Sequence, residues 1–124
     1  MTAGRYDIYI EQGSKKTIVI EFLNSDNTPI NLTGFKFRMQ MRPYVTSPVV
    51  QDELTDDNGR ILVEPEIGRI GLDYPSAVTS AYTFVGKNGC SSVYDLEWFE
   101  SGEAKRKLEG NVTISPEVTK IDTE

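Results

Sequence analysis

The chain contains no histidine and only one cysteine, Cys90, among its 124 residues. Histidine is the commonest metal ligand and a frequent general base, so its absence removes most transition-metal sites and most nucleophile and base pairs. A lone cysteine cannot close a disulfide within the chain. Cys90 also lies in a loop-like segment, residues 87–92, with no imidazole to generate a thiolate. We therefore expect no catalytic residue, no metal site and no cofactor.

Long apolar runs are also missing. No segment approaches the roughly 20 consecutive apolar residues that a membrane-spanning helix needs. Residues 1–5 lead directly into a strand-like pattern without the apolar stretch of a signal peptide. We expect a protein that is made in a cytoplasm, stays soluble and has no membrane partner.

Positive charge is in short supply. Lysine and arginine number 13 against 19 acidic residues, which gives a formal net charge of -6. The long-range field of such a chain repels the phosphate backbone, so nucleic acid is not expected as a partner. The basic run at residues 105–107 should lie next to acidic side chains of the same hairpin, which cancel much of its field.

The carboxylates do not form a recognisable catalytic or metal pattern. Residues 56–59 (Asp-Asp-Asn-Gly) are loosely similar to a calcium loop, but the twelve-residue spacing that ends in glutamate is not satisfied. A hairpin turn explains this segment better. Asp95, Glu97 and Glu109 could share an outer sheet face, as the paired acids of a glycosidase do, but exposed acids across neighbouring strands are far commoner.

What the chain does have is a series of short segments in which apolar and polar residues alternate. The clearest is residues 35–42, where Phe35, Phe37, Met39 and Met41 alternate with basic and amide side chains. Such a pattern predicts a strand with one face buried and the other in water. Similar but shorter patterns occupy residues 6–11, 17–22, 60–63, 69–72, 94–99 and 108–114.

The last two of these segments form a predicted β-hairpin. Residues 100–103 (Glu-Ser-Gly-Glu) supply the turn, since Gly102 can take a positive φ. Tyr94 and Trp98 face the same way as Leu96 in the alternating pattern, so we expect Trp98 to be buried. Four inward-facing rings are expected to meet in the core: Phe22, Phe37, Tyr94 and Trp98.

Little of the chain favours helix. Residues 75–82 could hold one helical turn after Pro75, and no other segment could supply a crossover helix between parallel strands. Residues 44–54 are weakly patterned, with Pro48 demoting the two valines that follow to an edge or loop. We predict an all-β fold, an immunoglobulin-like antiparallel β-sandwich of about seven strands formed by residues 1–116, followed by a polar tail at 117–124.

Several motifs resemble those of a known group of proteins. One is a strand that ends in Glu11-Gln12-Gly13, and another is a turn of the type Asp-x-x-Pro-Ile-x-Leu-Thr-Gly at residues 26–34. With the segments at 39–42, 94–97, 108–112 and 115–119, they resemble small virion proteins of tailed bacteriophages. The chain is similar over nearly its whole length to the immunoglobulin-like module at the N-terminus of phage upper baseplate proteins.

This resemblance implies a non-enzymatic structural component of a tailed-phage virion, made in the host cytoplasm. The component could belong to the baseplate, tail or neck, or be a capsid decoration. Its partners would be other phage virion proteins and copies of itself in a symmetric array. No catalytic or ligand residue carries over to this chain.

The alternative is a module that binds a host-surface glycan. Sugar sites usually expose aromatic rings, and Tyr44 with Tyr74, on what we expect to be neighbouring loops, would be the platform. Under the structural hypothesis, sheet edges, these loops and the tail offer contacts to neighbouring proteins. The candidate partner contacts are therefore Tyr44, Tyr74, Glu117, Val118, Lys120 and Ile121.

Overall fold

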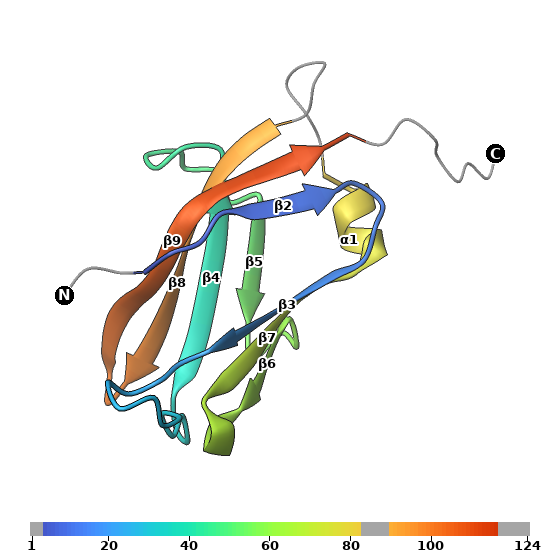
Figure 1. Cartoon of the computed structure of the whole chain (residues 1–124). Helices are drawn as coiled ribbons and strands as arrows, with labels where there is room; N and C mark the ends of the chain where they lie inside the picture. The colour runs from blue at the N-terminus through green and yellow to red at the C-terminus, as the bar shows by residue number, and fades with distance from the viewer. Residues whose placement is uncertain (1–3, 83–89, 117–124) are drawn as a thin grey trace.

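Strands with alternating inward and outward side chains build two packed sheets (Figure 1). The structure is a computed structural model that describes residues 4–82 and 90–116. The larger, six-stranded sheet has the order β1-β9-β8-β4-β5, with β2 also paired to β9. Its strands are β1 (Gly4–Arg5), β2 (Ile8–Glu11), β4 (Lys36–Arg42), β5 (Asp52–Thr55), β8 (Cys90–Glu100) and β9 (Glu103–Ser115).

The smaller, three-stranded sheet has the order β3-β7-β6. It consists of β3 (Lys16–Glu21), β6 (Ile61–Glu64) and β7 (Arg69–Tyr74). A 3-10 turn at Pro65–Ile67 separates β6 from β7, and the short helix α1 (Ser76–Ser80) follows β7. Pro75 stands directly before α1, as the sequence predicts for residues 75–82. Within the described ranges, no helix has the length and apolar character needed to cross a membrane.

The predicted all-β sandwich is confirmed, with one change in how its strands pair. The strand order of the larger sheet, β9-β8-β4-β5, matches the order G-F-C-C′ of immunoglobulin domains. The order of the smaller sheet, β3-β7-β6, matches the order B-E-D. The first strands, however, run parallel to β9, so the six-stranded sheet is not wholly antiparallel. A parallel partner distant in sequence cannot be read from alternation alone.

The parallel pairing of the N-terminal segment with β9 requires a glycine at position 110. Between β1 and β2 the chain is held by Tyr6 N, which donates to Glu109 O over 3.0 Å, and by Asp7 Oδ1, which accepts from Asn111 N over 3.0 Å. A Cβ atom added to Gly110 would lie 2.2 Å from Tyr6 O. The backbones therefore approach too closely for any other residue at this position.

An aromatic cluster fills the core near the β8–β9 turn. Trp98 is 7% exposed, which confirms its predicted burial, and its ring centroid lies 5.3 Å from that of Phe22 and 6.3 Å from that of Phe37. The fourth ring is Phe35, at 4.9 Å from Trp98, rather than the expected Tyr94. Tyr94 is buried on the same sheet face but lies about 13 Å back along β8, at roughly 3.3 Å per residue.

A nearly buried ion pair joins the two sheets at the start of β5, at Asp52. The Arg60 guanidinium donates to both oxygens of Asp52, over 3.1 and 2.8 Å, and the two side chains are only 14% and 10% exposed. Arg60 Nε donates to Asp73 O, and Tyr82 Oη donates to Asp52 Oδ2, each over 2.7 Å. The guanidinium also lies 5.6 Å from the ring centroid of Tyr74. One cluster thus connects β5, β7, the start of β6 and the segment after α1.

The expectation that Val49 and Val50 belong to an edge or loop is confirmed, because both precede the edge strand β5, which begins at Asp52. Two other local expectations need correction. The turn at 56–59 is present, but it crosses from one sheet to the other and does not close a hairpin. Cys90 begins β8 and does not lie in a loop. The turn closes no hairpin because β5 pairs with β4 and β6 pairs with β7. Cys90 is part of a strand because it pairs with Ile114 of β9.

Replacing Gly110 with alanine should be strongly destabilising, because the new methyl group would meet the backbone of Tyr6. We expect a loss of about 1–3 kcal/mol in the free energy of unfolding, as for other overpacked sites. The matched control is Gly71→Ala in β7, where an added Cβ meets nothing within 4 Å. In urea denaturation, the free energy of unfolding of Gly71→Ala should lie within about 1 kcal/mol of that of the parent protein. Equal effects of the two substitutions would contradict the close approach.

The buried tyrosines should make the fold sensitive to alkaline pH. Burial raises the pKa of Tyr74, Tyr82 and Tyr94 well above the ordinary value of 10.0, and for the first two the Asp52 carboxylate raises it further. The folded state therefore favours the neutral phenols. This preference makes its full contribution to the free energy of unfolding below pH 10. As the pH rises above 10, the free energy of unfolding falls by up to about 1.4 kcal/mol per pH unit for each tyrosine.

Spectrophotometric titration checks this directly. At pH values where the native fold survives above 10, the native protein should lack the phenolate absorbance of these three tyrosines, and urea-unfolded protein should show it. Full phenolate absorbance in the native state would contradict their burial.

Candidate binding surface

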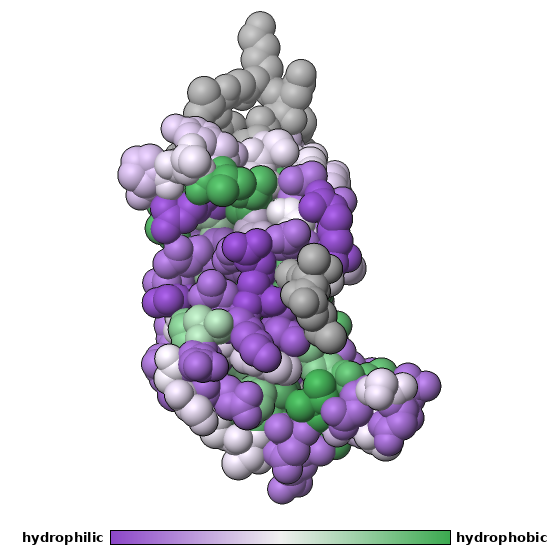
Figure 2. Space-filling model, turned by 90° about the vertical axis from the view of Figure 1, so that its left-hand side faces the viewer, coloured by the Kyte–Doolittle hydropathy of each residue, from purple (hydrophilic) through white to green (hydrophobic). Residues whose placement is uncertain are grey.

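The loop that joins β4 to β5 carries exposed apolar side chains. Tyr44 is 58% exposed, Val45 79% and Val49 57%, and Val50 is also exposed. Single exposed apolar residues are ordinary on protein surfaces, but a group of them on one loop is typical of a contact surface. Figure 2 shows a largely hydrophilic face with one hydrophobic area near its upper end, the end at which this loop projects in Figure 1, and another near its lower end.

The loop is held in place by hydrogen bonds to its own base. Arg42 Nη1 donates to Ser47 O over 2.7 Å, and Ser47 N donates to Tyr44 O over 3.0 Å. The Ser47 hydroxyl accepts from Val49 N over 3.1 Å, and Ser47 as a whole is buried. The exposed side chains are therefore presented on a fixed backbone, which lowers the entropy cost of binding a partner.

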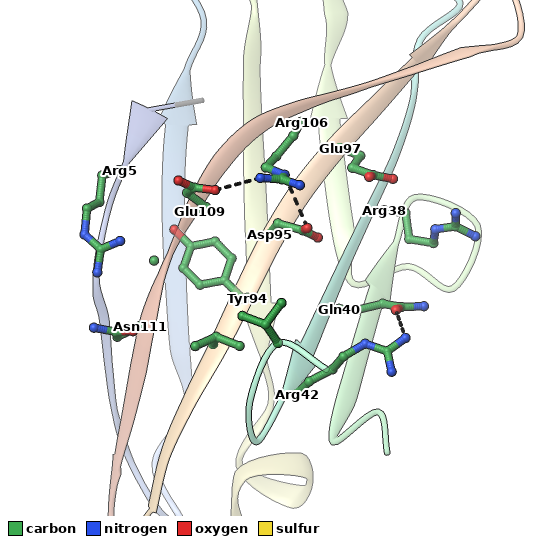
Figure 3. Close-up of a pocket in the computed structure, with 13 residues that line it drawn as sticks. Arg5, Arg38, Gln40, Arg42, Tyr94, Asp95, Glu97, Arg106, Glu109 and Asn111 are labelled. Carbon is green, nitrogen blue, oxygen red and sulfur yellow. Dashed lines mark hydrogen bonds and ion pairs between the residues drawn. The ribbon is translucent and has the colours of Figure 1, made fainter. Parts of the chain in front are cut away.

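Below the loop, the outer face of the six-stranded sheet is hollowed into a groove of about 530 Å³ (Figure 3). Residues from β1, β4, β8 and β9 line it, and Val45 of the loop closes one side. The charged lining residues are Arg5, Arg38, Arg42, Arg106, Asp95, Glu97 and Glu109. Because outward side chains of adjacent strands lie side by side, the polar face of each alternating segment contributes to one continuous surface.

Arg106 occupies the middle of the groove and neutralises two acids. Its Nε lies 3.5 Å from Asp95 Oδ2 and its Nη1 lies 3.0 Å from Glu109 Oε1. The prediction that Asp95, Glu97 and Glu109 share the outer face is confirmed. Of the acids of the hairpin expected to cancel the charge of residues 105–107, Glu109 pairs with Arg106. Lys107 Nζ lies 4.3 Å from the ring centroid of Trp98.

The β4 side of the groove has arginines without acidic partners. Arg38 lies with its guanidinium carbon 5.1 Å from the ring centroid of Phe99, and no carboxylate in residues 4–82 or 90–116 forms an ion pair with it. Arg42 donates to Gln40 Oε1 over 2.8 Å as well as to the loop. Gln40 Nε2 in turn donates to Glu53 Oε2 over 2.8 Å. This strand presents a row of hydrogen-bond donors toward the groove.

The predicted contact residues are only partly brought together. Tyr44 is exposed on the loop as expected. Tyr74 is 0% exposed at the end of β7, so the expectation that it forms an exposed platform with Tyr44 is wrong. Its position could have been predicted, because Ile70, Leu72 and Tyr74 continue one inward-facing alternation. The other candidates lie outside the described residues: Glu117, Val118, Lys120 and Ile121.

Sequence reasoning missed the valines of the loop and the groove itself. The sequence of the loop is weakly patterned. Alternation of apolar and polar residues predicts which side chains of a strand are exposed, but it does not do so for a loop. The arginines did carry a signal, since Arg38 and Arg42 occupy the polar positions of the best strand pattern. Among the described residues, no three or more cysteine, aspartate or glutamate side chains are grouped so that they could hold a metal ion.

Replacing Arg42 with lysine should loosen the loop without unfolding the sheet, because an ammonium group cannot reach Ser47 O and Gln40 Oε1 with the same planar fork. We expect the Val49 amide, which donates to the Ser47 hydroxyl, to exchange its hydrogen about tenfold faster, equivalent to about 1.4 kcal/mol. Arg38→Lys, on the same strand face, is the control and should leave this amide unchanged. Equal exchange in both variants would refute the anchoring role.

Comparisons with known proteins give distant likenesses only. No family model matches the chain, and no curated protein sequence is similar to it. Among solved structures, it is similar to the N-terminal domain of phage TP901-1 ORF48, with a TM-score of 0.43 and 10% identity over 94% of this chain and 99% of that chain. It is also similar to CopC from Methylosinus trichosporium OB3b, with a TM-score of 0.46 and 12% identity over 96% of this chain and 90% of that chain. Neither likeness assigns a function to the chain.

Proposed function

We propose that this protein is a non-enzymatic structural component of a tailed-phage virion that works through protein–protein contacts. Its place would be in the baseplate, tail or neck, or on the capsid as a decoration. The proposal starts from the motifs that resemble phage virion modules, such as Glu11-Gln12-Gly13 and the turn at residues 26–34. These motifs lie at strand ends and turns, so they concern the fold more than any chemistry.

The observation that carries the proposal is the fixed, apolar loop between β4 and β5. Tyr44, Val45 and Val49 are each more than half exposed, and Arg42 holds the backbone beneath them. Burying such side chains against a partner contributes about 25 cal/mol per Å² of apolar surface. A preformed loop releases this free energy without first having to be ordered.

The available side-chain chemistry supports a role in contact and not in catalysis. The chain has no histidine, and two of the three acids that line the groove are held by Arg106. The glycan-binding alternative loses its proposed platform, since Tyr74 is buried.

Contacts with further copies would add to those of the loop. β5 ends the six-stranded sheet, and β3 and β6 are the two edges of the three-stranded sheet, so their outer backbone groups are open to a neighbour in the described structure. An acidic surface disfavours a large apolar dimer interface. In a symmetric array, however, many modest contacts act together and give high overall affinity.

The double substitution Tyr44→Ser with Val45→Ser tests the proposal. Both side chains are exposed, so the variant should fold and unfold as the parent does, with a change within about 0.5 kcal/mol. Its incorporation into phage particles, measured by quantitative mass spectrometry of purified virions, should fall at least about tenfold, the equivalent of about 1.4 kcal/mol of lost contact.

The matched control is Val19→Ser with Leu62→Ser. These side chains are 60% and 59% exposed and lie on the outer face of the three-stranded sheet, away from the loop. The control should be incorporated like the parent protein. Normal incorporation of the loop variant, or absence of the parent protein from purified particles, would refute the proposed function.

A further inference from the structure

We propose that the groove on the outer face of the six-stranded sheet binds an extended acidic segment of a partner protein. The partner's carboxylates would bind Arg38 and Arg42, and one of its apolar side chains would pack on Val45. This inference rests on the proposed function and names the chemistry of the partner.

The shape of the surface favours a single extended segment. The groove is concave, with a volume of about 530 Å³, and is bounded by the β4–β5 loop at Val45. Its floor consists of the outward side chains of neighbouring strands, as the labelled residues in Figure 3 show. A flat sheet face of another domain could not fill such a hollow, whereas a peptide chain can lie in it.

The charge of the groove differs from that of the whole protein. The chain carries a formal charge of -6, yet the groove lining has four arginines and only three acids. Asp95 and Glu109 are already paired with Arg106. Arg5 is paired with Asp7 over 3.2 Å, and Glu97 lies opposite Arg38 in the register of β4 and β8. Within the described part of the chain, the lining residues without an ion pair are thus two arginines and one acid, which leaves a small local excess of positive charge on an acidic protein.

Arg38 and Arg42 retain unused donors. A guanidinium carries five N–H donors, and Arg42 uses one on Ser47 O and one on Gln40 Oε1. The guanidinium carbon of Arg38 lies 5.1 Å from the ring centroid of Phe99, and no acid among the described residues is ion-paired with its N–H groups, which can therefore bind a carboxylate. Bidentate arginine and carboxylate pairs are among the strongest polar contacts in proteins.

The spacing of the two arginines matches an extended peptide. Arg38 and Arg42 are four residues apart on one face of β4, which corresponds to about 13 Å. Carboxylates at positions i and i+4 of an extended segment have the same separation. A partner strand with alternating acidic residues would thus place one carboxylate on each arginine, and its next apolar side chain could reach Val45.

Two other ligand classes fit less well. Nucleic acid would bring a phosphate at every nucleotide, including over Asp95, Glu97 and Glu109, whereas an extended peptide can carry its acids opposite Arg38 and Arg42 and neutral side chains elsewhere. A glycan would need an exposed ring, and Tyr94, the one aromatic side chain in the lining, is buried with its hydroxyl donating to Tyr6 O over 2.5 Å.

The test uses the full-length protein and a fluorescent peptide of about nine residues in which glutamate alternates with threonine and one end carries a leucine. Fluorescence anisotropy should show binding that weakens as salt rises from about 50 to about 500 mM. A peptide with glutamine in place of glutamate should bind at least about tenfold more weakly, because it offers no charge-assisted contact.

The variants locate the site. Arg38→Gln should weaken binding of the glutamate peptide about two- to fivefold, the effect expected from the loss of one partly exposed ion pair. The control Arg69→Gln removes a guanidinium of the other sheet, paired to Glu21 over 3.0 Å, and should leave affinity unchanged. The inference would be overturned if the glutamate peptide did not bind, or if the two peptides bound equally. It would also be overturned if Arg38→Gln bound the peptide as tightly as the parent does, or if single-stranded DNA or a sulfated glycan bound more tightly than the peptide.

Failure of this inference and failure of the proposed function are distinguishable. If the peptide does not bind but the loop variant of Tyr44 and Val45 is still lost from particles, only the acidic-segment inference is wrong. If the peptide binds through Arg38 and the loop variant is incorporated normally, the groove inference stands and the virion role is refuted.

Discussion

The ion pair between Asp52 and Arg60 is the interaction on which the arrangement of this sandwich depends most. Almost excluded from water, it connects β5 of one sheet to the start of β6 in the other and, through Tyr82 and the carbonyl of Asp73, to the segment after α1 and to β7. Burying two charges costs free energy. The ion pair offsets this cost only because nearly every polar atom of the two side chains has a hydrogen-bond partner. Removal of one member would leave the other uncompensated, at a cost of about 3–5 kcal/mol.

The ion pair between Asp52 and Arg60 also helps to fix the geometry of the candidate binding surface. β5 is a short edge strand of the six-stranded sheet, and the ion pair at Asp52 fixes the point at which the β4–β5 loop ends. Arg42 fixes the other end of the loop by binding Ser47 O, so Tyr44 and Val45 stand at a defined position above the groove. An apolar loop and a row of arginines thereby form one surface, with an apolar contact at one end and charged contacts below it.

Much of the fold could be predicted from sequence because half-buried strands alternate. That pattern placed β4 and the β8–β9 hairpin correctly, buried Trp98, and assigned the arginines of β4 to the wet face. The same rule, applied through Ile70 and Leu72, would have shown that Tyr74 is buried. Alternation cannot predict which strands become neighbours, so the parallel pairing with β9, the short strand β5 and the groove between strands all required the three-dimensional structure.

The central claim is that the protein contacts its partners through the β4–β5 loop and the outer face of the six-stranded sheet. Hydroxyl-radical footprinting of Tyr44, in purified phage particles and in the free protein, tests it most directly. Tyr44 is 58% exposed in the free protein, so it should be oxidised readily there and be protected in the particle, while Val19 on the opposite sheet reacts alike in both. Equal oxidation of Tyr44 in both states would contradict the account.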